Sequence, residues 1–148
     1  MATRTWLIEL SKEACEELLG TAVIGRLGVI IDGKPQVFPI SHLYDRGSVI
    51  FPTNDRAKMH AALAWPWVGF EVDCIDADGL HGWSVMVQGR AEEITDADVI
   101  ERAAARRTIL WRDGESVHWI RIVATEMTGR RISAETIPDQ RASAVSKP

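Results

Sequence analysis

The chain has 148 residues and a formal net charge of -4, and hydrophobic residues make up 46% of it. This length is typical of one domain with its own core, so we expect a single domain. The acidic balance excludes the broad cationic surface that binds a nucleic acid backbone. No segment approaches the ~18 apolar residues of a membrane span, and Met1–Trp6 lacks the apolar core of a secretory signal, so we expect a cytoplasmic protein.

The first half of the chain predicts a short helix followed by three strands. Ser11 can cap a helix over 11–20 that carries an apolar stripe and ends at a glycine. Two β-rich runs, 22–31 and 36–44, flank an Asp-Gly pair, which is a strong hairpin signal. A further turn leads into a third strand at 48–53, so these strands are expected to form an antiparallel meander.

The second half mixes strands with two more helices. Pro66 closes the first of these helices, because the residue before a proline is pushed out of the helical region. Thr95 and Asp98 have the spacing of a capping box and open the second. The expected elements are a helix over 55–64, strands over 67–73 and 82–94, a helix from Thr95 to about Arg107, and a strand over 117–127.

Six strands of modest length with only three short helices favour a mainly β fold. Parallel strands need a crossover helix between each pair, and the chain has too few helices for that arrangement. A six-stranded antiparallel Greek-key split β-barrel fits this order best. We place the domain over 1–133 and expect a flexible C-terminal tail over 134–148, which has little apolar periodicity and either frays or lies over a neighbour.

The sequence holds no standard catalytic or metal-binding constellation. Its four histidines are scattered, and no HExxH, cysteine cluster or nucleophile motif is present, so we predict no metal site and no hydrolase chemistry. We interpret His42 as a surface residue. Cys15 and Cys74 are interpreted as small apolar residues of the core, because their spacing fits no disulfide framework.

A polar strand end that runs into a helix start is the best candidate for a ligand site. Between Phe51 and Lys58, the expected helix N-terminus offers backbone N–H groups, and Thr53, Arg56 and Lys58 add a hydroxyl and two cations. These groups together suit a phosphate. The alternative is a capped helix with two solvated cations, and these residues alone do not separate the two interpretations.

Three further segments give the chain a family resemblance. They are Gly25-Arg26-Leu27-Gly28, the run from Val37 to His42, and Gly82-Trp83-Ser84-Val85-Met86-Val87-Gln88-Gly89-Arg90. With the phosphate loop and Phe70-Glu71-Val72-Asp73, they follow the order found in the flavin-binding split barrels of the pyridoxamine 5′-phosphate oxidase-like superfamily. The chain resembles in particular the small, nitroimidazole-reductase-like branch of that superfamily, from Leu10 to Ile132.

The resemblance implies a homodimer that holds flavin mononucleotide (FMN) at the subunit interface. The implied cofactor-binding residues are Pro39, Ile40, Ser41, Phe51, Thr53, Arg56, Lys58, Trp83, Ser84 and Gln88. The first three would run beside the isoalloxazine ring, and the next four would lie near the ribityl phosphate, which Lys58 would neutralise. The last three would approach the cofactor from a wall of the barrel.

Ordinary structural roles stay open for several of these residues. Pro39 can simply mark a strand edge or a bulge. Trp83 alternates with two valines, as a core residue does. On a neighbouring strand, Glu71 and Asp73 are either solvated or paired with Arg26 or Arg90.

The function implied by the resemblance is transfer of hydride or electrons between a reduced nicotinamide and a small-molecule acceptor. In such an enzyme FMN carries the chemistry, and the protein orients it and excludes water. Two alternatives stay open. The first is a reductase that uses the deazaflavin F420 on the same barrel, and the second is a module that binds flavin or haem without catalysis.

Overall fold

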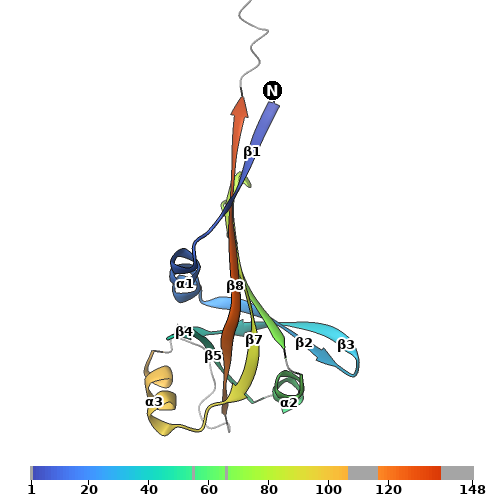
Figure 1. Ribbon diagram of the computed structural model, residues 1–148, viewed down its shortest axis with the longest axis vertical. Coiled ribbons are helices and arrows are strands. Elements are labelled where there is room, and N and C mark those ends of the chain that lie inside the picture. Colours follow the sequence, from blue (N-terminus) through green and yellow to red (C-terminus); the bar gives the residue numbers. More distant parts are fainter. Residues whose placement is uncertain (1, 55, 66, 107–116, 138–148) are drawn as a thin grey trace, which may run out of the picture.

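The computed structural model describes residues 2–54, 56–65, 67–106 and 117–137. Within them, eight strands form one sheet and three short helices pack beside it (Figure 1). The helices are α1 (Lys12–Thr21), α2 (Arg56–Ala64) and α3 (Ala97–Ala105). The strands are β1 (Ala2–Glu9), β2 (Ile24–Ile31), β3 (Lys34–Ser41), β4 (Leu43–Asp45), β5 (Ser48–Thr53), β6 (Val68–Ile75), β7 (His81–Glu93) and β8 (His118–Ile137).

The sheet is antiparallel and open. Its strands follow the order β3-β2-β6-β7-β8-β5-β4, and β1 pairs with β8. No ladder among the described strands joins β3 to β4 at the two ends of this order, although β3 contacts β5. A mainly β, antiparallel split barrel is therefore confirmed, with eight strands in the described residues in place of the six expected.

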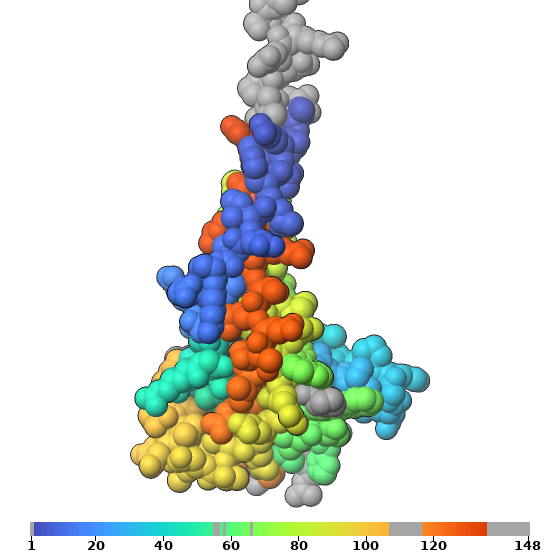
Figure 2. Space-filling view, in the orientation of Figure 1, coloured from blue at the N-terminus to red at the C-terminus, as the bar shows by residue number. Residues whose placement is uncertain are grey.

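The additional strands have two origins. The expected strand over 36–44 breaks at His42 into β3 and β4. Residues 2–9, which were not expected to be a strand, form β1 and pair with 130–137 of β8. These two segments form an arm that projects from the body of the molecule (Figures 1 and 2). Burial does not alternate along β1, because both of its faces are largely exposed, and so periodicity gave no signal.

The arm also changes the expected domain boundary. β8 continues to Ile137, so the first residues of the expected tail at 134–148 belong to a strand. Residues 138–148 lie outside the described part of the chain. Among the described residues, no helix is long and apolar enough to cross a membrane.

Local signals account for the turn and the helix starts. Asp32 and Gly33 have φ values of 52° and 75°, as the primed turn of a tight hairpin requires, and the β2–β3 hairpin is confirmed. Ser11 caps α1 by accepting the Ala14 N–H at 3.2 Å, also as expected. The cap of α3 was predicted one residue early. Asp96, not Thr95, is in the extended cap conformation, and its carboxylate accepts the N–H groups of the first turn.

The core lies inside the bent sheet and includes residues of the adjacent strands β6 and β7. Val68, Phe70 and Val72 of β6 and Val85 and Val87 of β7 are all buried, so the alternation seen in the sequence is confirmed. Large buried residues from the other strands complete this core; they include Leu27, Phe51, Ile120 and Ile122.

The two cysteines have different environments. Cys15, on the inner side of α1, is fully buried as expected. The prediction for Cys74 was wrong, because it is exposed. Cys74 has the same phase along β6 as the buried Phe70 and Val72, but it lies near the end of the strand, beyond the part that the core covers.

Candidate functional site

The end of β3 offers an open strand edge. Among the described strands, β3 pairs only with β2, so one row of its backbone N–H and C=O groups has no neighbouring strand. Pro39 is exposed there and lies opposite Arg26, where its lack of an N–H suits an edge position. Ile40 is buried in the core, so only its backbone can face a ligand along this edge.

Ser41, the last residue of β3, has a buried hydroxyl that lacks a partner. Its Oγ makes no hydrogen bond to any part of the chain that the structure describes. A buried polar group left unpaired costs about 1–3 kcal/mol, and such groups usually pair with a ligand or water. The polar edge of a flat cofactor lying along β3 would supply that partner.

The corner between β5 and α2 lies next to this edge. Phe51 and Thr53 end β5, and both side chains are buried, with only 1% and 2% of their surface exposed. The Phe51 ring is therefore a core side chain. α2 begins at Arg56 and packs against β5 and β2, while β3 contacts β5. The structure thus brings the predicted β3 and β5 residues together with the start of the helix that carries Arg56 and Lys58, whose side chains lie outside the described atoms.

His42, like Cys74, was placed wrongly from the sequence. It was expected on the surface, but only 4% of it is exposed. Its Nε2 lies 3.0 Å from the Leu19 carbonyl oxygen, and its ring meets the edge of Phe70 at a centroid distance of 4.8 Å. Burial lowers the pKa of His42, and the backbone carbonyl groups of Leu19 and Val23 oppose that shift. Neutral His42 therefore donates from Nε2, which leaves Nδ1 without a partner in the described residues.

The residues predicted on β7 lie at some distance from the β3 edge. Trp83 is half-buried and packs against the core, which matches the core role left open for it. Ser84 lies opposite Asp73 on the outward face of the sheet. β6 and β2 separate β7 from β3 in the sheet order, and three strand spacings amount to about 14 Å. One chain therefore does not place Ser84 beside Ser41.

Charged side chains on the outward face form a small ion-pair cluster. Arg26 of β2 lies 3.3 Å from Glu71 and 3.2 Å from Asp73 on β6, so the pairing with Arg26 is confirmed. Burial raises the pKa of Glu71; the neighbouring carboxylate of Asp73 acts in the same direction, and Arg26 opposes both. All three groups are partly exposed, so the cluster contributes little to stability.

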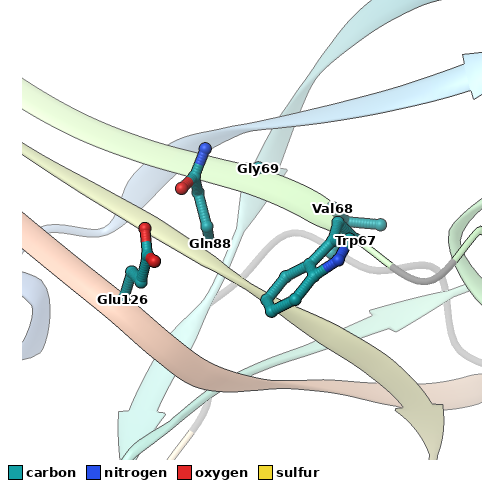
Figure 3. A pocket seen from close by; sticks show the side chains of 5 residues that line it. All are labelled: Trp67, Val68, Gly69, Gln88 and Glu126. Atoms are coloured by element: carbon teal, nitrogen blue, oxygen red, sulfur yellow. The ribbon is translucent and has the colours of Figure 1, made fainter.

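A hollow on the outward face is lined by Gln88, the third residue predicted on β7, together with residues that were not predicted (Figure 3). Its volume is about 290 Å³, and its lining residues are Trp67, Val68, Gly69, Gln88 and Glu126. Gln88 and Glu126 are cross-strand partners of β7 and β8, and Figure 3 shows their side chains next to each other, with the Trp67 indole on the other side of Gln88. The exposed tryptophan at a strand start was the signal that could have indicated this site.

The β6–β7 turn brings three potential metal ligands together. Asp76, Asp78 and His81 have ligand atoms within 4.8 Å of one another, and all three are exposed. Asp78 accepts the Leu80 N–H at 2.8 Å, and this hydrogen bond is the main reason why its pKa is lowered. The arrangement is that of a hydrogen-bonded turn.

Comparison with known proteins places the chain among relatives of the same size. It is 31% identical over 136 residues to the uncharacterized protein Rv0080 of Mycobacterium tuberculosis, covering 82% of this chain and 90% of that protein. Its fold matches an FAD binding protein from Mycobacterium smegmatis with a TM-score of 0.74 and 31% identity, covering 85% of this chain and 98% of that one. An FAD-binding protein from Mesorhizobium loti matches with a TM-score of 0.76 and 26% identity, covering 88% and 99%.

A sequence model of one protein family covers nearly the whole described domain. The model, described as pyridoxamine 5′-phosphate oxidase, matches residues 11–131. This range contains β2 to β7, all three helices and most of β8, so it includes the β3 edge, the β5–α2 corner and the hollow. The resemblance read from the sequence is confirmed: the chain belongs to the pyridoxamine 5′-phosphate oxidase family.

Proposed function

We propose that the protein is an FMN-dependent oxidoreductase that passes hydride or electrons from a reduced nicotinamide to a small acceptor. The observation that carries this proposal is the buried, unpartnered hydroxyl of Ser41 at the end of the open edge of β3. The similarity to FAD-binding proteins of known structure supports a flavin in particular. The isoalloxazine ring is common to FMN and FAD, so both are candidate ligands for this edge.

The chain's own groups divide into two parts of a flavin site. Along β3, the unpaired backbone groups and the Ser41 hydroxyl suit the alternating donors and acceptors of the ring's polar edge. At the β5–α2 corner, the helix N-terminus and the cations of Arg56 and Lys58 suit the phosphate. The flavin supplies the hydride chemistry when bound, and these residues hold and orient it.

A second copy of the chain would complete the site. Ser84 is too far from β3 to reach a ring held by its own chain, but a partner's outward face can bring Ser84 to that ring. The outward face carries an exposed apolar band made by cross-strand partners: Ile75, Gly82, Ile132 and Leu7. Ile75 is 71% exposed and Leu7 60% exposed, which indicates a surface that another molecule covers.

Titration with FMN, followed by flavin fluorescence, tests the cofactor site. We expect Ser41→Ala to weaken FMN binding about tenfold, the effect of one lost hydrogen bond to a buried group, while Ser133→Ala on the arm leaves it unchanged. Lys58→Ala should weaken FMN more than it weakens riboflavin, which has no phosphate. Lys34→Ala, at the exposed start of β3 and at the opposite end of the strand from Ser41, is the matched control.

The outcome of the titration also decides between the functions left open. Retention of F420 but not of FMN or FAD would mean that the cofactor is F420 and that the proposed site is otherwise correct. Flavin binding without oxidation of a reduced nicotinamide in the presence of a generic acceptor would make the protein a binding module. Failure to bind any of the three cofactors would overturn the proposal.

A further inference from the structure

The hollow beside Trp67 has side chains of a binding site and no role in the flavin site proposed above. Ile75 lies six residue steps beyond Gly69 on β6, so the hollow lies about 20 Å along the strand from the apolar band. Its volume of about 290 Å³ is at the lower limit for ligand pockets, which suits a single heterocyclic ring system.

The floor and one wall of the hollow suit a flat ring. Gly69 has no side chain, and a Cβ built there would meet no atom within 4 Å, so the space above the strand is open. Trp67 stands beside it with 54% of its surface exposed, which is unusual for so large an apolar side chain. An exposed indole next to open backbone provides a surface on which a nitrogen heterocycle stacks.

The polar groups of the hollow define the edge of that ring. The Glu126 carboxylate only accepts hydrogen bonds, whereas the Gln88 amide also donates. These side chains lie side by side on neighbouring strands, and neither has a hydrogen bond or ion pair among the described residues. A complementary ring edge therefore carries two adjacent N–H donors for Glu126 and a carbonyl acceptor for Gln88.

We propose that this hollow binds a 2-amino-4-oxopyrimidine ring, the edge shared by guanine and the pterins, stacked on Trp67. The ring N–H and the 2-amino group donate to Glu126, and the 4-oxo group accepts from Gln88. Adenine does not fit, because its single amino group lies next to ring nitrogens that accept. The isoalloxazine edge does not fit either, because its one N–H lies between two carbonyl groups.

Arg90 is a cation on the strand that carries Gln88, close enough along the chain to meet the phosphate of a bound nucleotide. Arg90 lies two residues after Gln88 on β7, on the same outward face, and opposite Val123. It is exposed and has no ion pair with any described residue. A guanine nucleotide therefore finds a partner for its phosphate there, whereas a pterin does not need one.

Isothermal titration of the full-length protein with GMP, IMP and AMP tests the ring edge without any mutation. IMP lacks only the 2-amino group, so it should bind about tenfold or more weakly than GMP, the effect of one lost hydrogen bond to a carboxylate. AMP should bind more weakly still. Equal affinity for GMP and AMP, or no binding of GMP and neopterin at millimolar concentration, overturns the proposal.

Variants test the residues themselves. Trp67→Ala should weaken GMP about tenfold, while Trp65→Ala, which removes an equally exposed tryptophan outside the hollow, should have no effect. Glu126→Gln should abolish the preference for GMP over IMP. Thermal melting of each variant shows whether it folds, and loss of GMP binding in Trp65→Ala as well as in Trp67→Ala contradicts the assignment.

Two further titrations identify the source of the ring and separate this site from the flavin site. Tighter binding of GMP than of guanosine, lost in Arg90→Gln, supports a nucleotide; tighter binding of neopterin than of GMP supports a pterin. FMN affinity should be the same in Trp67→Ala as in the wild type, so the two proposals fail independently. Competition of FMN with GMP for one site would overturn the proposal for the hollow.

Discussion

The imidazole of His42 is held among carbonyl groups and apolar side chains, so its proton affinity is linked to folding. Because burial lowers its pKa, the unfolded chain binds a proton more readily than the folded chain does. The stability contributed by neutral His42 is complete above the ordinary histidine pKa, about 6.5, and is lost as the pH falls through the lowered value. The free energy of unfolding should therefore decrease on acidification, by at most about 1.4 kcal/mol per pH unit for this one proton.

Urea unfolding between pH 7.5 and pH 5 measures this dependence. His42→Gln keeps a donor for the Leu19 carbonyl oxygen but does not titrate, so its stability should depend less on pH than that of the wild type. His60→Gln, at an exposed position of α2, is the control and should keep the wild-type slope. An unchanged slope in His42→Gln would show that other groups dominate acid unfolding.

Gly25 illustrates how a single missing Cβ shapes the core beneath the β3 edge. A Cβ at this position would lie 2.1 Å from Cζ of Phe70, whose ring also packs against the ring of His42. Gly25→Ala should therefore destabilise the protein by about 1–3 kcal/mol or more, as overpacking does. Gly20→Ala, in α1 with open space around the added Cβ, should instead stabilise it by about 0.5–1 kcal/mol. In thermal melting, the melting temperature should fall in Gly25→Ala and rise in Gly20→Ala.

At the scale of elements, one hydrogen bond ties α1 to β4. The Tyr44 hydroxyl donates to Glu16 at 2.9 Å, and burial, followed by this hydrogen bond, raises the pKa of Tyr44 to about 12. Because Tyr44 is the only tyrosine, phenolate absorbance reports on it alone. We expect half-ionisation of the folded protein well above pH 10, and a lower value in Glu16→Gln, which removes the charge that disfavours phenolate. The stability contributed by protonated Tyr44 is complete below pH 10 and is lost as the pH rises toward 12.

The elements that sequence reasoning predicted well are those with one buried face. β6 and β7 alternate because their inner residues form the core, and the β2–β3 turn needs the positive φ of Asp32 and Gly33. β1 escaped prediction because neither of its faces is buried within one chain. Cys74 and His42 were misplaced because burial depends on which part of a strand the rest of the fold covers, and local patterns do not encode that.

The candidate site was predictable to a similar degree. Motif order placed Ser41 and Thr53 at adjoining strand ends, and in the structure β3 contacts β5, the strand that leads into α2. The same reasoning grouped Gln88 with the flavin residues, because neighbours along a strand appear equivalent in a motif. That assignment stays a prediction, and the cross-strand register adds that Gln88 shares a hollow with Glu126, a residue about forty positions away that no motif linked to it.

In the molecule as a whole, the arm is the part that the proposed second copy would cover. At the tip of the arm, residues 2–5 pair only with 134–137 among the described strands, and such a two-stranded ribbon is marginally stable in water on its own. Nearer the body of the molecule the arm carries exposed Leu7, Ile8 and Ile132. Leu7 and Ile132 are cross-strand partners and continue the row of Ile75, whereas Ile8 is directed to the other face of the ribbon. If the outward face is the contact between copies, a charge should disturb the dimer only when it is placed on the face that carries Leu7 and Ile132.

Neighbouring lysine substitutions on the arm test that argument. Leu7→Lys places a charge in the apolar band and should shift the protein from dimer toward monomer in sedimentation experiments, with weaker FMN binding because Ser84 of the partner no longer reaches the ring. Ile8→Lys adds the same charge one residue away, on the opposite face of β1, and should leave both properties unchanged. A dimer that is insensitive to Leu7→Lys, or a wild-type protein that sediments as a monomer at micromolar concentration, would contradict the proposed interface. Loss of the dimer in both variants would instead place the contact on the arm as a whole, because the two side chains share only that ribbon.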